Sequence, residues 1–398
     1  MNIHVVTISR WPSELADSRL MVKMSEQFAK AGHQVDYIIP NRPQTNSGLK
    51  HISPWNYYQI APNQFDLFKL PVISSKFLDL LHLGHLSLMY TFLVSYWLFF
   101  HNRLPHLIYS YHKEIPILKL LMPSVSIALE LHELPTDTYQ QLIFSLTKHN
   151  VDIWIVPTIK LKQFLINQSV SNARIIVTPS GYDPHAFQVL SKSTARKNLQ
   201  LPINHNIIGY IGNLEGKDGS RGVDILLKAV QNLSTSTSNI LLVSVGGENT
   251  LVKKYRQLAG SLHVSKFVKF IPQVPHHKVT DYLFAFDVCV MPFPNTPHYR
   301  NYMSPMKMIE YMASGRPIVT TDLPSVREIL NEKSAILVKP DDPQDLARGI
   351  ELALKPSATI KAQLAHKNVK QYTWAHRAQL IFTQLSQLET NLHNLKII

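Results

Sequence analysis

The sequence predicts an α/β protein built from two domains, each with a parallel sheet. Short runs rich in β-branched and aromatic residues alternate with helical patterns, which is typical of βαβ units. This alternation occurs twice, once in each half of the chain. A length of 398 residues also exceeds the size at which a single hydrophobic core keeps growing, so two domains are expected.

Each predicted strand is a short apolar run that ends at turn residues or at the start of a helical pattern. In the first half the predicted strands are 3–8, 34–40, 107–111, 125–132, 151–157 and 174–180. In the second half they are 206–213, 239–247, 266–271, 288–293, 316–322 and 335–340. Residues 183–205, which are polar and carry prolines, are predicted to be the linker between the domains.

The composition is that of a globular protein with a basic second half. Hydrophobic residues make up 45% of the chain, and its single cysteine, Cys289, cannot form an intrachain disulfide. The net charge is +13. Up to residue 190 the chain has 15 Lys and Arg against 12 Asp and Glu, and from residue 191 onward it has 25 against 15. No run of basic residues interleaved with aromatics occurs, so nucleic acid is not the expected partner.

The N-terminus begins with a short apolar strand and no basic segment before it, so we expect no cleaved signal peptide and a cytoplasmic location. The longest apolar stretch, 86–100, falls short of the about 20 residues of a membrane-spanning helix. It is predicted to be a core helix. The alternative is a helix that touches a membrane surface peripherally through its aromatic residues Tyr90, Tyr96, Trp97, Phe99 and Phe100.

The segment SPMKMIEYMASGRP, residues 304–317, has the layout of a phosphate-binding helix. Ser304 is a good N-cap residue and Pro305 suits the first helical position. The backbone N–H groups of Met306 and Lys307 should then point outward without partners, and such a helix start attracts phosphate.

A carboxylate follows on the same helix. Glu310 lies within two turns of the helix start, close enough to accept hydrogen bonds from a ribose whose diphosphate rests there. Gly315 is predicted to end the helix. The alternative is an ordinary capped surface helix with an ion pair between Lys307 and Glu310.

A glycine-rich stretch, residues 209–229, precedes another amphipathic helix and carries Gly212, Asn213, Lys217 and Arg221. Glycine lets backbone approach a phosphate closely, and a basic side chain there can neutralise a departing diphosphate. The stretch lacks the G-K-[ST] of a P-loop, and the first strand lacks the dinucleotide fingerprint. Taken alone, the stretch is more typical of a flexible connection.

His132 and Glu133 directly follow the predicted strand at 125–132, at the strand end where open α/β folds bind ligands. The alternative for His132 is a strand-end histidine that hydrogen-bonds to backbone. Glu133 either orients an acceptor or pairs with a basic neighbour.

Several segments together resemble the retaining glycosyltransferases of family 4, which have the GT-B fold. They are SPMKMIEYMASGRPIVTTDLPSVREIL, YIGNLEGKDGSRGVDILLKAV, VTPSGYDPHAF, LELHELP and YTWAHRAQLI. The resemblance implies two Rossmann-like domains that face each other across a cleft. Residues 1–183, completed by a C-terminal helix at about 372–398, would form the acceptor domain, and residues 184–371 would bind the donor.

Carried over by position, the resemblance assigns Glu310 to the ribose hydroxyls and the helix start at Ser304, Pro305, Met306 and Lys307 to the diphosphate. Arg221 matches the family lysine that contacts the leaving phosphates. His132 matches the family histidine near the sugar and the attacking hydroxyl.

The sequence departs from the family pattern at two donor positions. Tyr302 stands where the family often carries a glutamate that holds sugar hydroxyls. Asn213 stands near the usual first basic residue of the glycine-rich loop, so Lys217 is expected to compensate.

The resemblance implies transfer of a hexose from a nucleotide-diphosphate sugar to an acceptor hydroxyl, with retention at the anomeric carbon. No metal and no cofactor are expected, because the sequence has no Asp-x-Asp motif. The expected acceptor is a glycan or lipid-linked molecule in polysaccharide, lipopolysaccharide or other cell-surface glycan synthesis. Two alternatives remain: a catalytically silent GT-B protein that binds a glycan or partner, and a nucleotide-sugar epimerase or hydrolase.

Overall fold

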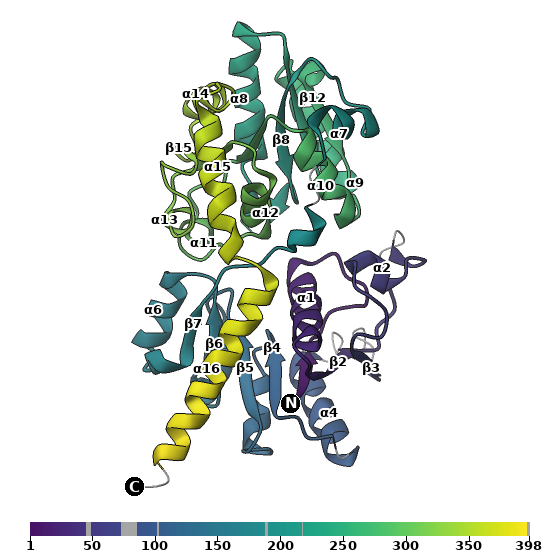
Figure 1. The fold of residues 1–398 in the computed structure, drawn as a ribbon, viewed down its shortest axis with the longest axis vertical. Helices are drawn as coiled ribbons and strands as arrows, with labels where there is room; N and C mark the ends of the chain where they lie inside the picture. The colour runs from purple at the N-terminus through teal and green to yellow at the C-terminus, as the bar shows by residue number, and fades with distance from the viewer. Residues whose placement is uncertain (45–48, 73–85, 102, 188–189, 217, 396–398) are drawn as a thin grey trace. The chain divides into compact units, whose positions relative to one another are not determined.

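The computed structural model divides the chain into two compact units (Figure 1). Unit 1 comprises Met1–Thr178 and Trp374–Ile398, and unit 2 comprises Pro179–Thr373. These limits differ by a few residues from the domain boundaries expected from the sequence. The structure describes residues 1–44, 49–72, 86–101, 103–187, 190–216 and 218–395.

Unit 1 is built on a seven-stranded, wholly parallel sheet with the order β3-β2-β1-β4-β5-β6-β7. Its strands are β1 (Asn2–Val6), β2 (Gln34–Pro40), β3 (Asp66–Leu70), β4 (Leu107–Ser110), β5 (Ser126–Glu130), β6 (Ile153–Val156) and β7 (Ile175–Val177). The six strands predicted in this half are confirmed, and β3 was missed. It lies at the sheet edge, where two of its five side chains, Asp66 and Lys69, are exposed, so it lacks the continuous apolar run of a buried strand.

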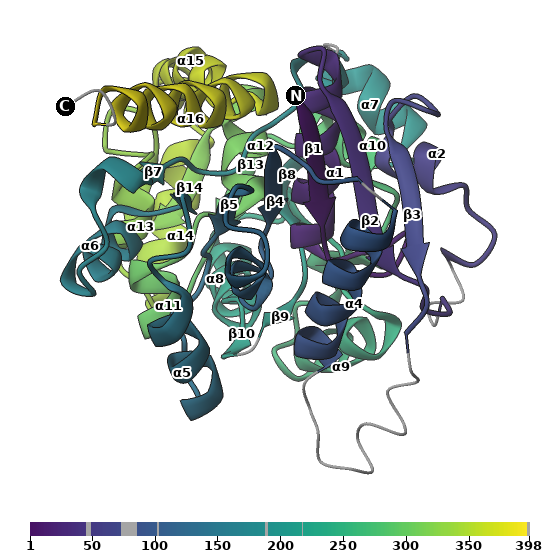
Figure 2. The same cartoon turned by 90° about the horizontal axis from the view of Figure 1, so that it is seen from below.

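Helices cover the sheet of unit 1, and the end of the chain supplies one of them. They are α1 (Ala16–Lys30), α2 (Pro54–Tyr58), α4 (Leu86–Phe100), α5 (Thr138–Thr147), α6 (Ile159–Asn167) and α16 (Trp374–Leu395). Short 3₁₀ turns occupy η2 (Ile115–Leu120) and η3 (Asn172–Arg174). Helix α16 packs against α1 and against β6 and β7, as Figures 1 and 2 show.

Helix α4 is half core and half surface. Tyr90 and Trp97 are 1% and 8% exposed, as expected for the predicted core helix, so the alternative that they belong to an outward aromatic face is wrong. Both lie in the unit 1 core. The outward face does carry Phe92, Tyr96, Phe99 and Phe100, all more than half exposed. Among the described residues no helix is both long and apolar enough to cross a membrane.

Unit 2 has a six-stranded parallel sheet with the order β12-β11-β8-β13-β14-β15. Its strands are β8 (Asn206–Ile211), β11 (Ile240–Val245), β12 (Val268–Ile271), β13 (Val288–Met291), β14 (Ile318–Thr321) and β15 (Ile336–Val338). All six second-half predictions are confirmed. The helices are α7 (Lys192–Asn198), α8 (Val223–Ser236), α9 (Asn249–Ser261), α10 (His276–Ala285), α11 (Pro297–Asn301), α12 (Met306–Ser314), α13 (Pro324–Arg327), α14 (Pro343–Ala353) and α15 (Ala358–Asn368), with 3₁₀ turns η4 (Pro184–Ala186), η5 (Ser265–Phe267) and η6 (Val369–Gln371).

Alternate residues of β8 belong to two different hydrophobic clusters. Ile207 and Ile211 pack in one cluster, and Ile208 and Tyr210 pack in the other. Because successive side chains of a strand point to opposite faces, both faces of this sheet are buried. The α/β class predicted for both halves of the chain is therefore confirmed.

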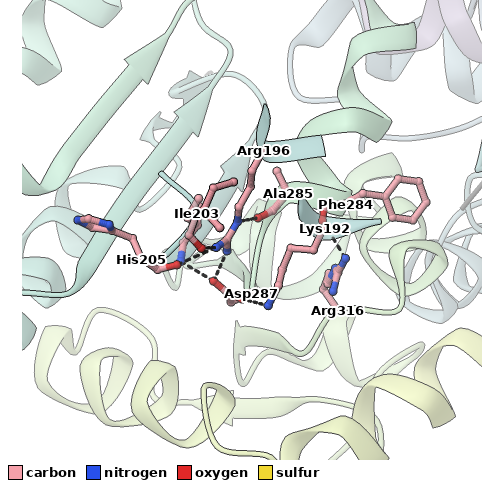
Figure 3. Close-up of polar contacts among 9 residues, drawn as sticks. Lys192, Arg196, Ile203, His205, Phe284, Ala285, Asp287 and Arg316 are labelled. Atoms are coloured by element: carbon pink, nitrogen blue, oxygen red, sulfur yellow. Dashed lines mark hydrogen bonds and ion pairs between the residues drawn. The ribbon is translucent and has the colours of Figure 1, made fainter. Parts of the chain in front are cut away.

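The predicted linker at 183–205 is wrong, because these residues belong to unit 2 and form part of it. Within them, Arg196 on α7 is 2% exposed. Its guanidinium donates to the carbonyl oxygens of Ala285, Ile203 and His205 at 2.9, 2.7 and 3.0 Å, and to Asp287 Oδ2 at 2.5 Å (Figure 3). The other polar side chains of α7, such as Lys192, Thr194 and Lys197, are exposed, so the segment is polar because one face of α7 lies in water.

We predict that Arg196→Met lowers the free energy of unfolding by about 3–5 kcal/mol, because it leaves three carbonyls without their buried donor and removes the buried ion-pair partner of Asp287, which keeps only the Ile207 N–H and the exposed Lys192. The matched control is Lys192→Met. Lys192 also pairs with Asp287, at 2.7 Å, but its side chain is 46% exposed, so its loss should cost less than about 1 kcal/mol. Urea unfolding of the two variants measures both effects, and equal losses would show that Arg196 does not anchor α7.

Candidate functional site

The predicted phosphate-binding helix is α12, and its start differs from the prediction by one residue. Pro305 has an extended backbone and is the N-cap, Met306 is the first helical residue, and Ser304 lies before the cap. No side chain caps the helix among the described residues. The first-turn N–H groups of Met306 and Lys307 have no carbonyl one turn earlier to bond, as predicted from helix geometry. Gly315 ends the helix in the left-handed conformation, as predicted.

The side chain of Lys307 is the feature of α12 that the sequence did not reveal. It is 7% exposed, and its Nζ lies 4.0 Å from the ring centre of Tyr210 and 4.8 Å from that of Phe293. This nitrogen has no hydrogen-bond partner among the described residues. Burial lowers the pKa of the ammonium well below its ordinary value, the charge of Arg221 lowers it further, and Glu310 opposes the shift.

Two glycines let the backbone at the end of β8 pass close to this amine. Gly212 has φ 135°, and a Cβ added to it would lie 3.3 Å from Lys307 Nζ. A Cβ added to Gly246 would lie 2.4 Å from the Gly212 carbonyl oxygen. Only glycine fits such an approach. The next residue, Asn213, is exposed, and its carbonyl accepts a hydrogen bond from the Tyr210 hydroxyl at 2.7 Å.

The glycine-rich stretch is ordered as a hairpin rather than a flexible connection. Strands β9 (Glu215–Gly216) and β10 (Gly219–Ser220) pair in antiparallel fashion. Lys217 lies outside the described residues. Gly222 has φ 83° and caps α8, and a Cβ there would meet the Pro292 carbonyl oxygen at 1.6 Å.

Arg221 follows the hairpin directly and is half-buried. Its backbone N–H donates to the Leu214 carbonyl at 3.0 Å, which fixes the base of the side chain. Its Nε is buried without a hydrogen-bond partner among the described residues. A Cβ added to Gly216 would lie 3.2 Å from this Nε and 2.8 Å from the Tyr299 hydroxyl. The guanidinium and the phenol therefore converge over the hairpin.

Glu310 does not pair with Lys307, so the alternative ion pair is wrong. Instead, Glu310 Oε1 lies 2.7 Å from His276 Nε2, and the glutamate is 8% exposed. His276 is the first residue of α10 and was missed. It is followed by His277, and nothing local in the sequence distinguishes the two. Tyr302 lies just after α11, and its side chain is half-buried.

In unit 1, His132 lies two residues beyond the end of β5, and Glu133 is next to it. The alternative proposed a hydrogen bond from His132 to backbone, and the ring makes none to the backbone of a described residue. Its Nε2 lies 2.9 Å from Glu130 Oε2, and Glu130 is in turn held by Arg377 and Tyr109. The sequence placed Glu130 inside the predicted strand at 125–132 but did not single it out, because its partner Arg377 lies 247 positions further along the chain.

Glu310, Lys307, Gly212 and Arg221 are thus brought together in unit 2, with the start of α12 among them. His132 and Glu133 belong to unit 1. Within the described ranges no group of three or more His, Cys, Asp and Glu side chains could hold a metal ion.

Part of the chain matches a known family. Residues 205–355 match the family "Glycosyl transferases group 1". The chain is 28% identical over 236 residues to the D-inositol 3-phosphate glycosyltransferase of Streptosporangium roseum, covering 56% of this chain and 52% of that protein. It is 27% identical over 265 residues to the putative teichuronic acid biosynthesis glycosyltransferase TuaC of Bacillus subtilis, covering 58% and 63%. The match therefore spans less than two thirds of either relative.

Two solved structures share the fold over nearly the whole chain. Sucrose-phosphate synthase from Thermosynechococcus elongatus superposes with a TM-score of 0.74 at 18% identity, covering 98% of this chain and 99% of that one. Anabaena HepE in complex with UDP and glucose superposes with a TM-score of 0.73 at 15% identity, covering 97% and 100%. The protein thus has the GT-B fold, and residues 205–355 are similar to the group 1 glycosyl transferases.

We predict that Lys307→Met stabilises the ligand-free protein by about 1–3 kcal/mol. The change removes a buried unpaired ammonium, whose penalty is several kcal/mol, and forfeits a cation–π attraction of about 2 kcal/mol. The pKa of Lys307 is lowered in the folded state. The loss of stability that the charged side chain causes is therefore fully present below that pKa, and it fades as the pH rises toward about 10.4, the pKa of a free lysine.

The measurement is the difference in unfolding midpoint between Lys307→Met and the wild type across neutral to alkaline pH. Lys228→Met is the control, because Lys228 is exposed on α8 and its loss should change stability by less than about 0.5 kcal/mol. A Lys307→Met variant less stable than the wild type at neutral pH would show that the amine is satisfied in the free protein.

Proposed function

We propose that this GT-B protein, with its segment similar to the group 1 glycosyl transferases, is a retaining glycosyltransferase. Unit 2 binds a nucleotide-diphosphate sugar, and the sugar moves to an acceptor hydroxyl. The single observation that carries the proposal is the pair of buried nitrogen atoms without described partners, Lys307 Nζ and Arg221 Nε, beside the start of α12.

A diphosphate fits these unpaired donors. A buried ammonium without a partner, such as that of Lys307, is costly, and an anion that binds it removes the cost. The first-turn N–H groups of Met306 and Lys307 add donors and the positive end of the helix dipole. Gly212 places no side chain against the same amine. Charge and donors thus favour an anion with at least two negative charges.

A nucleotide sugar supplies such an anion together with ribose hydroxyls. Glu310 is suited to accept hydrogen bonds from those hydroxyls, and His276 holds its carboxylate in place. The structural neighbour HepE is described in complexes with UDP and with UDP-glucose, which supports this class of donor. Ser304, Pro305 and Tyr302 complete the donor side, with Asn213 next to the glycine loop.

In the proposed reaction the bond from the anomeric carbon to the diphosphate oxygen breaks, and a bond from the acceptor oxygen forms on the same face. The acceptor proton passes to an oxygen of the departing diphosphate. Arg221, Lys307 and the start of α12 stabilise the negative charge that develops there. His132 and Glu133 are assigned to the sugar and acceptor side. The positive charge comes from the protein itself, so the proposal includes neither a metal nor a cofactor.

The proposed acceptor is a hydroxyl of a cell-surface glycan or of its lipid-linked precursor, and the sugar is a hexose. The relative TuaC is named for teichuronic acid biosynthesis, which supports a polysaccharide acceptor. The exposed aromatic residues on α4, Phe92, Tyr96, Phe99 and Phe100, support peripheral contact with a membrane surface, where such acceptors are held. Flotation with liposomes tests this contact, and a Phe99→Ser/Phe100→Ser variant is expected to lose it.

We predict that one nucleotide class among UDP, GDP and ADP, with its sugar conjugates, raises the unfolding temperature of the wild type, because it binds only the folded protein. Glu310→Gln should weaken this binding by about tenfold or more, the effect of lost charge-assisted hydrogen bonds. Glu351→Gln is the control, since Glu351 is exposed on α14 of the same unit. An unchanged nucleotide affinity in Glu310→Gln would show that Glu310 does not bind the ribose hydroxyls.

Turnover distinguishes the remaining alternatives. A transferase consumes its donor only with an acceptor, and the product should keep the anomeric configuration by NMR. An epimerase or hydrolase would consume the donor alone. Binding without turnover would support the alternative of a catalytically silent GT-B protein. That alternative is suggested by Tyr302, which stands in place of the family glutamate. Activity that survives excess EDTA would support the absence of a metal.

A further inference from the structure

Glu130 of unit 1 is a buried carboxylate with every lone-pair site occupied. Its side chain is fully buried. Oε1 accepts from Arg377 Nη1 at 2.6 Å and from the Tyr109 hydroxyl, while Oε2 accepts from Arg377 Nη2 at 2.9 Å. His132 Nε2 lies 2.9 Å from the same Oε2. Two oxygens have about four acceptor sites, so these four contacts saturate the group.

The charge state of Glu130 decides which nitrogen of His132 carries its hydrogen. Burial would raise the pKa of the carboxyl, but the charge of Arg377 and the hydrogen bonds from His132 and Arg377 lower it to about 2. The group is therefore ionised at neutral pH and can only accept. His132 Nε2 must then be the donor, which leaves the lone pair of the neutral ring on Nδ1.

We propose that Glu130 is a positioning residue that holds His132 with its hydrogen on Nε2, so that Nδ1 accepts a hydrogen bond from a substrate hydroxyl. The His132 side chain is 39% exposed, and Nδ1 has no hydrogen bond to a described residue. Arg377 and Tyr109 act one step further back, because they hold the carboxylate that orients the ring. The claim that Nδ1 binds a substrate hydroxyl rests on the proposed function, whereas the claim that the hydrogen sits on Nε2 does not.

The competing explanation is structural. Arg377 is 2% exposed on α16, and its bidentate pair with Glu130 joins this helix to the end of β5. In that case the contact with His132 would be incidental. The two explanations differ in what happens to the ring of His132 when Glu130 is changed, and in whether Glu130 and His132 act through each other.

The first test reads the tautomer directly. With ¹⁵N-labelled histidine, two-bond correlations at about pH 8.5, two units above the ordinary histidine pKa of about 6.5, should show the His132 hydrogen on Nε2. The signal is assigned by its absence in His132→Ala. Glu130→Met and Glu130→Met/Arg377→Met, which leave no acceptor for Nε2–H, should lose the fixed tautomer, and the double variant removes the uncompensated guanidinium that could unfold the single one. A His132 tautomer that is the same in a folded Glu130 variant as in the wild type would overturn the proposal.

The control is Asp36→Asn, which removes the carboxylate of a second buried histidine pair in unit 1, between His4 Nε2 and Asp36 Oδ2 at 3.0 Å. It should lower stability and leave the His132 signal unchanged. Loss of the His132 tautomer in this variant as well would mean that general loosening of unit 1 is the cause, which also overturns the proposal.

The second test is a double-mutant cycle on transfer activity. Glu130→Gln should lower kcat/KM about tenfold or more, and Glu130→Gln added to His132→Ala should cost nothing further, because Glu130 acts through His132. Additive losses would show an independent structural effect and contradict the positioning role. A wild type that transfers no sugar would defeat the proposed function, while the NMR result would still decide the tautomer.

Discussion

Unit 2 keeps the ammonium of Lys307 buried without a partner among the described residues, and the arrangement around it follows from this constraint. Two aromatic rings contact the ammonium, but rings cannot replace the hydrogen bonds that water would give. The nearby backbone comes close only because Gly212 and Gly246 carry no side chain. A site with such a cost in the free protein is suited to bind an anion, since the anion supplies the opposite charge and the hydrogen-bond acceptors that the amine lacks.

The buried carboxylate of unit 1, that of Glu130, is by contrast fully paired. Glu130 and Arg377 satisfy each other fully, and Tyr109 and His132 occupy the remaining acceptor sites. A saturated carboxylate of this kind is rigid and does not take up a ligand itself. What it offers is orientation, because the one exposed member of the group, His132, has a single ring nitrogen left to use. The two units therefore differ: unit 2 holds a buried amine without a described partner, and unit 1 holds a buried carboxylate whose acceptor sites are all occupied.

The sequence predicted the repeated βα pattern well because parallel strands buried on both faces are continuous apolar runs, as β8 and β13 show. The same reasoning missed β3, an edge strand with two of its five side chains exposed. It also took 183–205 for a linker, because polar residues normally signal a loop. There the polar Arg196 is buried and bonded to carbonyls far along the chain, a pairing that no local pattern contains.

For the site, the sequence by itself determined the start and end of the α12 segment to within a residue, the glycines beside it and the candidate residues Glu310, Arg221 and His132. These follow from local rules of capping, backbone freedom and strand ends. The partners of those residues were decided only by the tertiary structure. His276 reaches Glu310 across 34 positions, and Arg377 reaches Glu130 across 247. Such pairs form because packing brings distant segments together and burial then requires each charge to find a partner, which is a property of the folded chain and not of any stretch of its sequence.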